Sequence, residues 1–305
     1  MGADQTATAN AINAIAAGLV NHVLVYRTTS EATTRCRVSR HATVLGGAGT
    51  TPRAWGAYQW MFPYNALTLG THMALFAQRH FHEYGTRPEQ LGQIAVNGRR
   101  NAALNPNAVL RTPITIDDYM ASRMISSPLR LLDCDIHVDG CTALVLSRRG
   151  LGHHGRRPIL VEAIGTALHA KGTLNPTDFT SLGAEAAAMQ MWSHTDLKPA
   201  DVDVAQIYDG YSILTLLWLE ALGFCPKGEG GRFLDGGHRI SLLGELPMNT
   251  GGGQLSAGRL HGHGHTFEAC EQLWGRAGDR QVKDAEVAIV SNGATGLGCM
   301  LLALA

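Results

Sequence analysis

The sequence predicts an α/β fold in which a parallel or mixed sheet is covered by helices on both faces. In the second half of the chain, apolar runs of strand length alternate with segments of helical period. These runs are apolar throughout, which is typical of strands buried on both faces. Hydrophobic residues make up 45% of the 305 residues and charged residues only 16%, so the chain can bury a large core.

The chain begins with a helical pattern that leads into an apolar run. Ile12 and Ile15 repeat with a helical period inside Gln5–Gly18, and glycine is typical of a helix end. The run His22–Tyr26 follows and is predicted to be a buried strand.

The next segment, as far as Ile116, differs in character because aromatic residues and prolines interrupt it. It is predicted to begin as an irregular loop, followed by helices over Leu75–Tyr84, Pro88–Asn101 and Thr115–Met124. The aromatic residues of the loop are Trp55, Tyr58, Trp60, Phe62 and Tyr64. They are expected to form either a small core under the loop or a cover over an apolar ligand.

The second half shows the regular alternation on which the fold class depends. Asp139–Ser147 is predicted to be a turn into a strand, and the basic, glycine-rich Arg148–Arg157 a linker. Further strands are expected over Ile159–Gly165, Val202–Ile207, Glu286–Ser291 and Cys299–Ala305, and helices over Gly183–Ser193, Ser212–Leu222 and Phe267–Gly275.

Composition excludes several classes of protein. The net charge is +0 and no basic run exceeds two residues, which argues against a nucleic-acid partner. No apolar run reaches the roughly 18 residues of a membrane span, and the polar start of the chain does not resemble a secretory signal. The six cysteines form no CxxC pair, so we expect reduced thiols and a cytoplasmic location.

The stretch Asn249–His265 is the most unusual part of the chain. It contains three consecutive glycines and then a glycine–histidine run, directly before a predicted helix. A glycine-rich turn that leads into a helix directs backbone N–H groups toward whatever lies in front of it. The alternatives are a tight loop with solvated histidines, or a metal site at the three alternating histidines, although no other residues with ligand spacing accompany them.

Several stretches together resemble the thiolase superfamily. The likeness is closest to its lipid-transfer branch, which includes the thiolase part of sterol carrier protein and acetyl-CoA acetyltransferases. It is carried by Ala14–Gly18, Ile114–Ser122, Ser127–Cys134, Ala205–Ser212, Leu222–Gly231 and Asn249–Gly264.

This resemblance implies a thiolase-like α/β/α/β/α layered fold with an inserted loop domain. Residues 1–27 and 125–150 would be the remainder of the N-terminal half, 28–124 the loop domain, and 151–305 the C-terminal half. The first half is then expected to be incomplete, truncated at its N-terminus relative to the family.

The resemblance also assigns positions to the catalytic groups, and all of them depart from the acyl-transfer pattern. The nucleophilic cysteine of the family falls on Met1, whose thioether cannot attack a thioester. The second motif falls on Tyr208–Tyr211, where Tyr208 could donate a hydrogen bond to an enolate oxygen, act as an acid or base, or pack as a strand-end tyrosine. Asp209 could contact substrate, orient a water, or cap the next helix.

The third and fourth motifs fall in the glycine-rich turns. Arg259 replaces the catalytic histidine of the family, so His261 is predicted as the acid/base group, with His263 as a further catalytic candidate. Ser291 replaces the second cysteine. The remaining predicted substrate-binding residues are Gly252, Gly253, Asn292 and Gly293, together with Arg259 and Ser291.

The preferred function implied by this pattern is retro-aldol cleavage of an acyl-CoA in lipid or sterol side-chain metabolism. That reaction needs a base and an enolate stabiliser but no nucleophile. The alternatives are an acetyl-CoA acyltransferase with its cysteine upstream of Met1, and a non-catalytic carrier of lipid–CoA. The expected partners are acyl-CoA as substrate, a second copy of the chain, and a small OB-fold, zinc-ribbon protein; no metal or other cofactor is expected.

Overall fold

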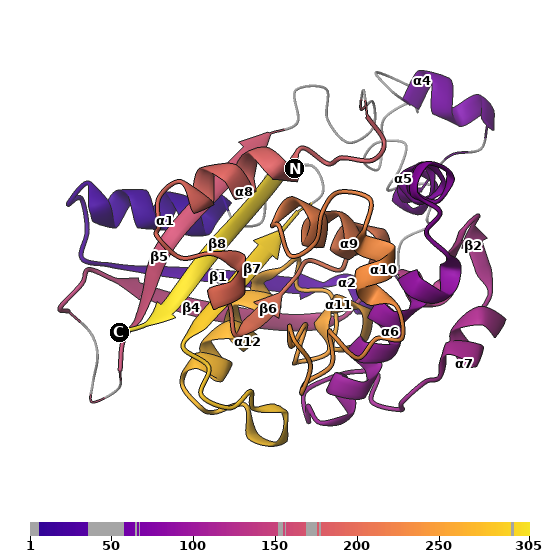
Figure 1. Cartoon of the computed structure of the whole chain (residues 1–305). Coiled ribbons are helices and arrows are strands. Elements are labelled where there is room, and N and C mark those ends of the chain that lie inside the picture. Colours follow the sequence, from indigo (N-terminus) through magenta and orange to yellow (C-terminus); the bar gives the residue numbers. More distant parts are fainter. Residues whose placement is uncertain are drawn as a thin grey trace.

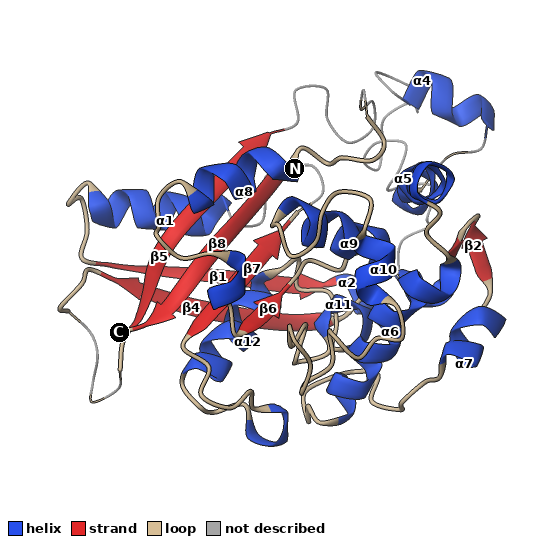
Figure 2. Cartoon of the chain, in the orientation of Figure 1, coloured by secondary structure: helices blue, strands red, loops and turns tan. Residues whose placement is uncertain are grey.

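The structure, a computed structural model, describes residues 6–35, 58–64, 66, 68–151, 155, 157–168, 176, 178–293 and 296–305 (Figure 1). Two main sheets and a set of helices account for most of these residues (Figure 2). No helix within the described ranges is both long and apolar enough to cross a membrane.

A four-stranded mixed sheet forms the centre of the second half of the chain. Its strands are β5 (Ile159–Leu168), β6 (Val204–Gln206), β7 (Val287–Asn292) and β8 (Gly296–Leu304), in the order β5-β8-β7-β6. β6 and β7 are parallel, whereas β8 is antiparallel to both of its neighbours. This confirms the mixed sheet predicted from the apolar runs.

A two-stranded antiparallel sheet pairs β1 (His22–Ser30) with β4 (Asp139–Ser147) along their whole length. The strand predicted at residues 22–26 is present, but the prediction that it is buried was wrong. Leu24 and Tyr26 are 60% and 65% exposed, and Val145 opposite Leu24 is 68% exposed. Successive side chains of a strand face opposite sides, and no described element covers the outer side of this sheet.

Two helices lie between the sheets. α12 (His263–Leu273) contacts β6 and β7 on one side and β4 on the other, and α1 (Thr6–Ala16) contacts β1 and β4. Ile12 of α1 joins a hydrophobic cluster that contains Val204 and Leu273. The opposite face of the four-stranded sheet is covered by α8 (Ala184–Trp192), which approaches so closely that a Cβ on Gly165 would lie 1.8 Å from the Ala187 carbonyl oxygen.

The described layers are therefore helix, sheet, helix, sheet, which is a thiolase-like α/β arrangement. The largest hydrophobic cluster lies under α8 and α9 (Ser212–Ala221) and includes the fully buried Trp218.

The remaining helices gather beside the carboxyl ends of the parallel strands β6 and β7 (Figure 1). α5 (Leu69–Tyr84) and α6 (Pro88–Ala103) are the longest, and both confirm helices predicted from the sequence. The others are α2 (Glu31–Arg35), α4 (Tyr58–Met61), α7 (Ile116–Ala121), α10 (Gly230–Leu234) and α11 (Gly253–Ser256), with a small hairpin of β2 (Met124–Ser126) and β3 (Leu129–Arg130).

The predicted aromatic cover can be checked only in part. Trp55 lies outside the described residues, as do the side chains of Tyr58, Trp60 and Phe62. Tyr64 is 81% exposed.

Candidate active site

The turn after β6 places Tyr208 at the edge where the parallel strands β6 and β7 end. The backbone N–H of Tyr208 donates to Ser291 Oγ at 3.0 Å, which ties this turn to β7. The Asn249 side chain holds the preceding residue from both sides: it accepts from Ile207 N at 2.7 Å and donates to Ile207 O at 2.9 Å. Tyr208 is 8% exposed, so both its backbone and its ring are held by the surrounding structure.

Asp209 is buried beside Tyr208 and faces the short helix α11. Its carboxylate accepts the backbone N–H groups of Gln254 at 2.8 Å and Leu255 at 3.4 Å. Asp209 therefore does cap a helix, but this helix is α11 and not the next helix along the chain, α9. Gly253 makes the approach possible, because a Cβ there would lie 2.0 Å from Asp209 Oδ2. Substrate contact by Asp209 remains a prediction.

The second glycine-lined turn is held through a single peptide unit. His261 and Gly262 both have left-handed backbone, with φ of 50° and 84°. The carbonyl of His261 accepts from Asn292 Nδ2 at 3.1 Å, and the N–H of Gly262 donates to Gln254 Oε1 at 3.1 Å. Because Ser291 holds the Tyr208 turn and Asn292 holds the His261 turn, two consecutive residues of β7 fix both turns at one sheet edge.

The three histidines of this run have different surroundings. The side chain of His261 is 23% exposed, and its Nε2 lies 3.1 Å from Glu31 Oε1. His263 begins α12 and is 6% exposed. His265 is 3% exposed; its Nε2 lies 3.0 Å from Asp209 Oδ1, and its ring centroid lies 6.4 Å from that of Tyr208. In the described part of the chain, no group of three metal-binding side chains is arranged to hold an ion.

Arg259 lies at the centre of a charged cluster between the turn and the first half of the chain. Its guanidinium pairs with Glu31, and its Nη1 lies 3.2 Å from Asp135 Oδ1. Burial opposes ionisation of Glu31, but hydrogen bonds from Arg259 and His261 outweigh it and lower the pKa of this carboxyl. Burial raises the pKa of Asp135 to about 7, with the nearby carboxylates of Asp209 and Glu31 adding to the effect and Arg259 opposing it.

The raised pKa of Asp135 predicts a pH-dependent stability. The folded protein holds this proton up to pH about 7, whereas an unfolded aspartate releases it near pH 4. Its contribution to the free energy of unfolding should therefore be complete below pH 4 and lost as the pH rises to 7. At about 1.4 kcal/mol per pKa unit, the loss is a few kcal/mol. Urea denaturation from pH 4 to pH 8 should show this fall in the wild type and a smaller fall in Asp135→Asn; equal slopes would contradict the assignment.

The other predicted site residues lie in the same region. Gly252 has a φ of 101° and packs against α6, where a Cβ would lie 2.7 Å from that of Ala102. The carbonyl of Gly293 accepts from Trp218 Nε1 at 3.3 Å. Whether these two glycines contact substrate remains a prediction.

Three residues of this region were not singled out from the sequence: Glu31, Asp135 and Gln254. His265 was considered only as one of three possible metal ligands and not as an acid/base group. Gln254 lies inside the stretch Asn249–His265, so its position in that stretch was the available signal. Glu31 and Asp135 are 228 and 124 positions from Arg259, and no local pattern connects them to it.

Four of the five described cysteines are poor candidates for the acyl-transfer nucleophile. Burial raises the pKa of four thiols to about 12, which keeps them protonated at neutral pH; these are Cys134, Cys225, Cys270 and Cys299. Met1, where the nucleophile of the family would fall, lies outside the described residues.

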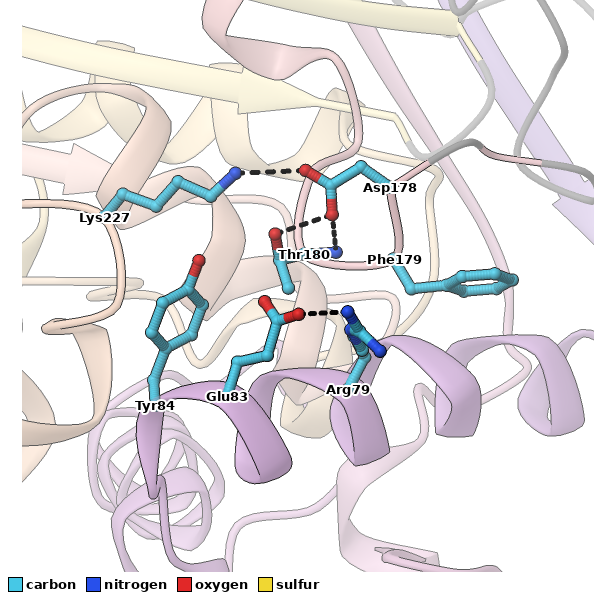
Figure 3. A pocket seen from close by; sticks show the side chains of 7 residues that line it. All are labelled: Arg79, Glu83, Tyr84, Asp178, Phe179, Thr180 and Lys227. Carbon is cyan, nitrogen blue, oxygen red and sulfur yellow. Dashed lines mark hydrogen bonds and ion pairs between the residues drawn. The ribbon is translucent and has the colours of Figure 1, made fainter.

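A pocket of about 480 Å³ opens between α5 and the segment around Asp178, and none of its lining residues belongs to the predicted site (Figure 3). Its four charged side chains pair with one another, Lys227 with Asp178 at 3.2 Å and Arg79 with Glu83. Because its charges are already paired, the pocket offers no excess charge to an ionic ligand.

Comparison with known proteins decides the family. A family model described as thiolase C-terminal domain-like matches residues 165–301. The chain is 34% identical to a steroid side-chain-cleaving aldolase of Thermomonospora curvata, covering 86% of this chain and 68% of that protein. This chain belongs to the thiolase superfamily. It is also 31% identical to rabbit sterol carrier protein 2 over 72% of this chain and 42% of that protein, in agreement with the predicted branch.

A further relative is an acetyl-CoA acetyltransferase of Methanothermobacter thermautotrophicus, 36% identical over 82% of this chain; the chain spans 65% of its length. Among solved structures, the Ltp2-ChsH2(DUF35) aldolase superposes with a TM-score of 0.85 at 30% identity, covering 99% of this chain and 78% of that one. These names agree with the thiolase-like fold and with the C–C bond chemistry next to a CoA thioester that the sequence predicts.

Proposed function

We propose that this protein is a lyase that cleaves the Cα–Cβ bond of a β-hydroxyacyl-CoA by a retro-aldol reaction, in the breakdown of lipid or sterol side chains. The observation that carries the proposal is the pair of turns fixed by Ser291 and Asn292, one bearing Tyr208 and the other His261. The aldolases among the relatives support the reaction class, and the acetyl-CoA acetyltransferase supports a CoA thioester as substrate.

The reaction needs two groups from the protein. A base takes the proton of the β-hydroxyl, the Cα–Cβ bond breaks, and the hydroxyl-bearing carbon becomes a carbonyl. The electron pair of the broken bond moves into the thioester as an enolate, which is then protonated at Cα. A hydrogen-bond donor at the thioester oxygen stabilises the enolate. No covalent bond to the protein forms, so the chemistry does not require a cysteine.

Tyr208 is the proposed donor to the enolate oxygen, and His261 is the proposed base. Glu31 Oε1, which lies 3.1 Å from His261 Nε2, would hold the imidazole ring in place. His265 is a second candidate for the base. Its Nε2 lies 3.0 Å from Asp209 Oδ1, and its ring lies beside that of Tyr208. The proposed binding groups around them are Gly252, Gly253, Arg259, Asn292 and Gly293, with His263 as a further acid/base candidate.

The two histidines can be distinguished by substitution. We expect His261→Ala to lower kcat for cleavage by roughly 100-fold, the range for loss of a general base, and to flatten the acidic limb of the pH–rate profile. His194→Ala, at an exposed histidine after α8, is the matched control. If His265→Ala flattens the profile and His261→Ala does not, the base is His265.

The proposed assembly contains a second copy of this chain and a small OB-fold, zinc-ribbon protein, acting in the cytoplasm. Support for the second protein comes from the Ltp2-ChsH2(DUF35) aldolase, whose name includes a second component with a DUF35 domain. The relatives include an enzyme named for a reaction of a CoA thioester. We therefore propose coenzyme A only as part of the substrate, and no metal or other cofactor.

Incubation with medium-chain and sterol-type acyl-CoAs, with and without such a partner, tests the proposal. Mass analysis should detect a shortened acyl-CoA and a carbonyl product from β-hydroxyacyl-CoA. Acyl transfer between two acyl-CoAs would instead favour the transferase alternative. Binding with no change of mass under any of these conditions would favour the carrier.

A further inference from the structure

Gln254 and Asn292 each hold one side of the peptide unit between His261 and Gly262, and each uses only half of its amide to do so. Gln254 uses Oε1 to accept from Gly262 N, and Asn292 uses Nδ2 to donate to His261 O, both at 3.1 Å. These bonds fix which end of each amide is oxygen and which is nitrogen.

The other halves of both amides are buried and have no hydrogen-bond partner in the described part of the chain. They are Gln254 Nε2, a donor, and Asn292 Oδ1, an acceptor. The two residues are 2% and 1% exposed. Buried polar atoms are nearly always satisfied in proteins. An unpartnered donor and an unpartnered acceptor on two amides that bind the same peptide unit therefore indicate a bound polar group.

The surroundings connect these atoms to the proposed reaction centre. Gln254 is in the first turn of α11, and its own N–H binds Asp209, the neighbour of Tyr208. Asn292 follows Ser291, which binds the Tyr208 backbone. Asn292 also packs directly against Gly262, where a Cβ would lie 2.2 Å from Nδ2 and 2.5 Å from Oδ1, so only glycine leaves the amide in place.

We propose that Gln254 Nε2 and Asn292 Oδ1 form a subsite that holds the hydroxyl group of the substrate in the binding complex. For cleavage, the O–H must turn about its C–O bond from Asn292 Oδ1 to the proposed base. A hydroxyl both accepts and donates, which matches an unpartnered donor together with an unpartnered acceptor, whereas a ketone or an alkyl group leaves at least one of them unsatisfied. The subsite explains why a retro-aldol enzyme would select the hydroxylated acyl chain, and to that extent it rests on the proposed function.

The test measures binding with ligands that cannot react. Two CoA thioethers are compared, one with a hydroxyl on the third carbon of the chain and one without; neither has the carbonyl that cleavage requires. Isothermal titration of the full chain should show about tenfold tighter binding of the hydroxylated thioether to the wild type. Gln254→Glu keeps the oxygen that accepts from Gly262 and removes the donor, so the preference should fall to less than twofold.

Gln190→Glu is the matched control, because Gln190 Oε1 also accepts a backbone N–H, from Thr166 at 2.8 Å, but lies on the exposed side of α8. It should keep the tenfold preference. If Gln254→Glu does not fold, Gln254→Met removes the same donor. Equal binding of the two thioethers by the wild type, or an unchanged preference in the Gln254 variants, would overturn the subsite. If the wild type cleaves β-hydroxyacyl-CoA but binds both thioethers equally, only the subsite is rejected. If the wild type prefers the hydroxylated thioether but shows no cleavage, only the proposed lyase activity is rejected.

Discussion

Tyr208→Phe should lower kcat for cleavage of a β-hydroxyacyl-CoA by roughly 100- to 1,000-fold, the usual loss when one donor to a developing oxyanion is removed. The change removes only the phenolic oxygen. The bond that positions the residue runs from its backbone N–H to Ser291 Oγ and is kept in the variant. The free energy of unfolding should change by no more than about 1 kcal/mol, as for loss of one ordinary hydrogen bond.

Steady-state kinetics with urea denaturation of the same preparations checks this prediction. Tyr26→Phe is the control, because it makes the same chemical change away from the site. Tyr26 is 65% exposed on the open face of β1. Both measurements for that variant should match the wild type. If Tyr208→Phe retains cleavage within threefold of the wild type, the phenol does not stabilise the enolate and another donor must be sought.

Much of this site could be predicted from sequence because its parts follow consecutive strands of one sheet. Tyr208 and Ser291 come at the ends of two apolar runs, and strands β6 and β7 are parallel neighbours, so their ends meet. The glycines around Gly253 likewise marked a place where the backbone approaches another group closely.

The ion pairs could not be predicted, because they join distant segments through side chains alone. Arg259 meets Glu31 just after β1, and nothing in the spacing of charges along the chain indicates this. The exposure of β1 was missed for a related reason. An apolar run such as His22–Tyr26 predicts a strand, but which of its faces is covered depends on layers contributed by other parts of the fold.

Gly253→Ala should have the largest effect on stability among the glycine substitutions near the site. The residue has a φ of 59°, and its new Cβ would lie 2.0 Å from Asp209 Oδ2. The carboxylate cannot simply swing away, because it is 1% exposed, binds two N–H groups of α11 and lies 3.0 Å from His265 Nε2. Displacing a buried, bonded charge typically costs about 3–5 kcal/mol, and cleavage should be lost as well.

Gly85→Ala separates the backbone strain from the collision. Gly85 has a similar φ of 71° at the end of α5, and a Cβ there would meet nothing within 4 Å. It should cost only the roughly 1–2 kcal/mol of a left-handed alanine. The same two measurements, urea denaturation and cleavage rate, then apply to both variants.

A double-mutant cycle tests whether the cost of Gly253→Ala beyond the backbone strain comes from the collision with Asp209. In an Asp209→Ala background the colliding oxygen is gone, and the new Cβ would be left with the tight contact of 3.1 Å to Asn249 Nδ2. Gly253→Ala should therefore cost only slightly more there than Gly85→Ala does in the wild type. If instead Gly253→Ala costs as much without Asp209 as with it, the glycine is required by the turn alone. The close fit of Asp209 against α11 would then be a consequence of the fold and not the reason for a glycine at this position.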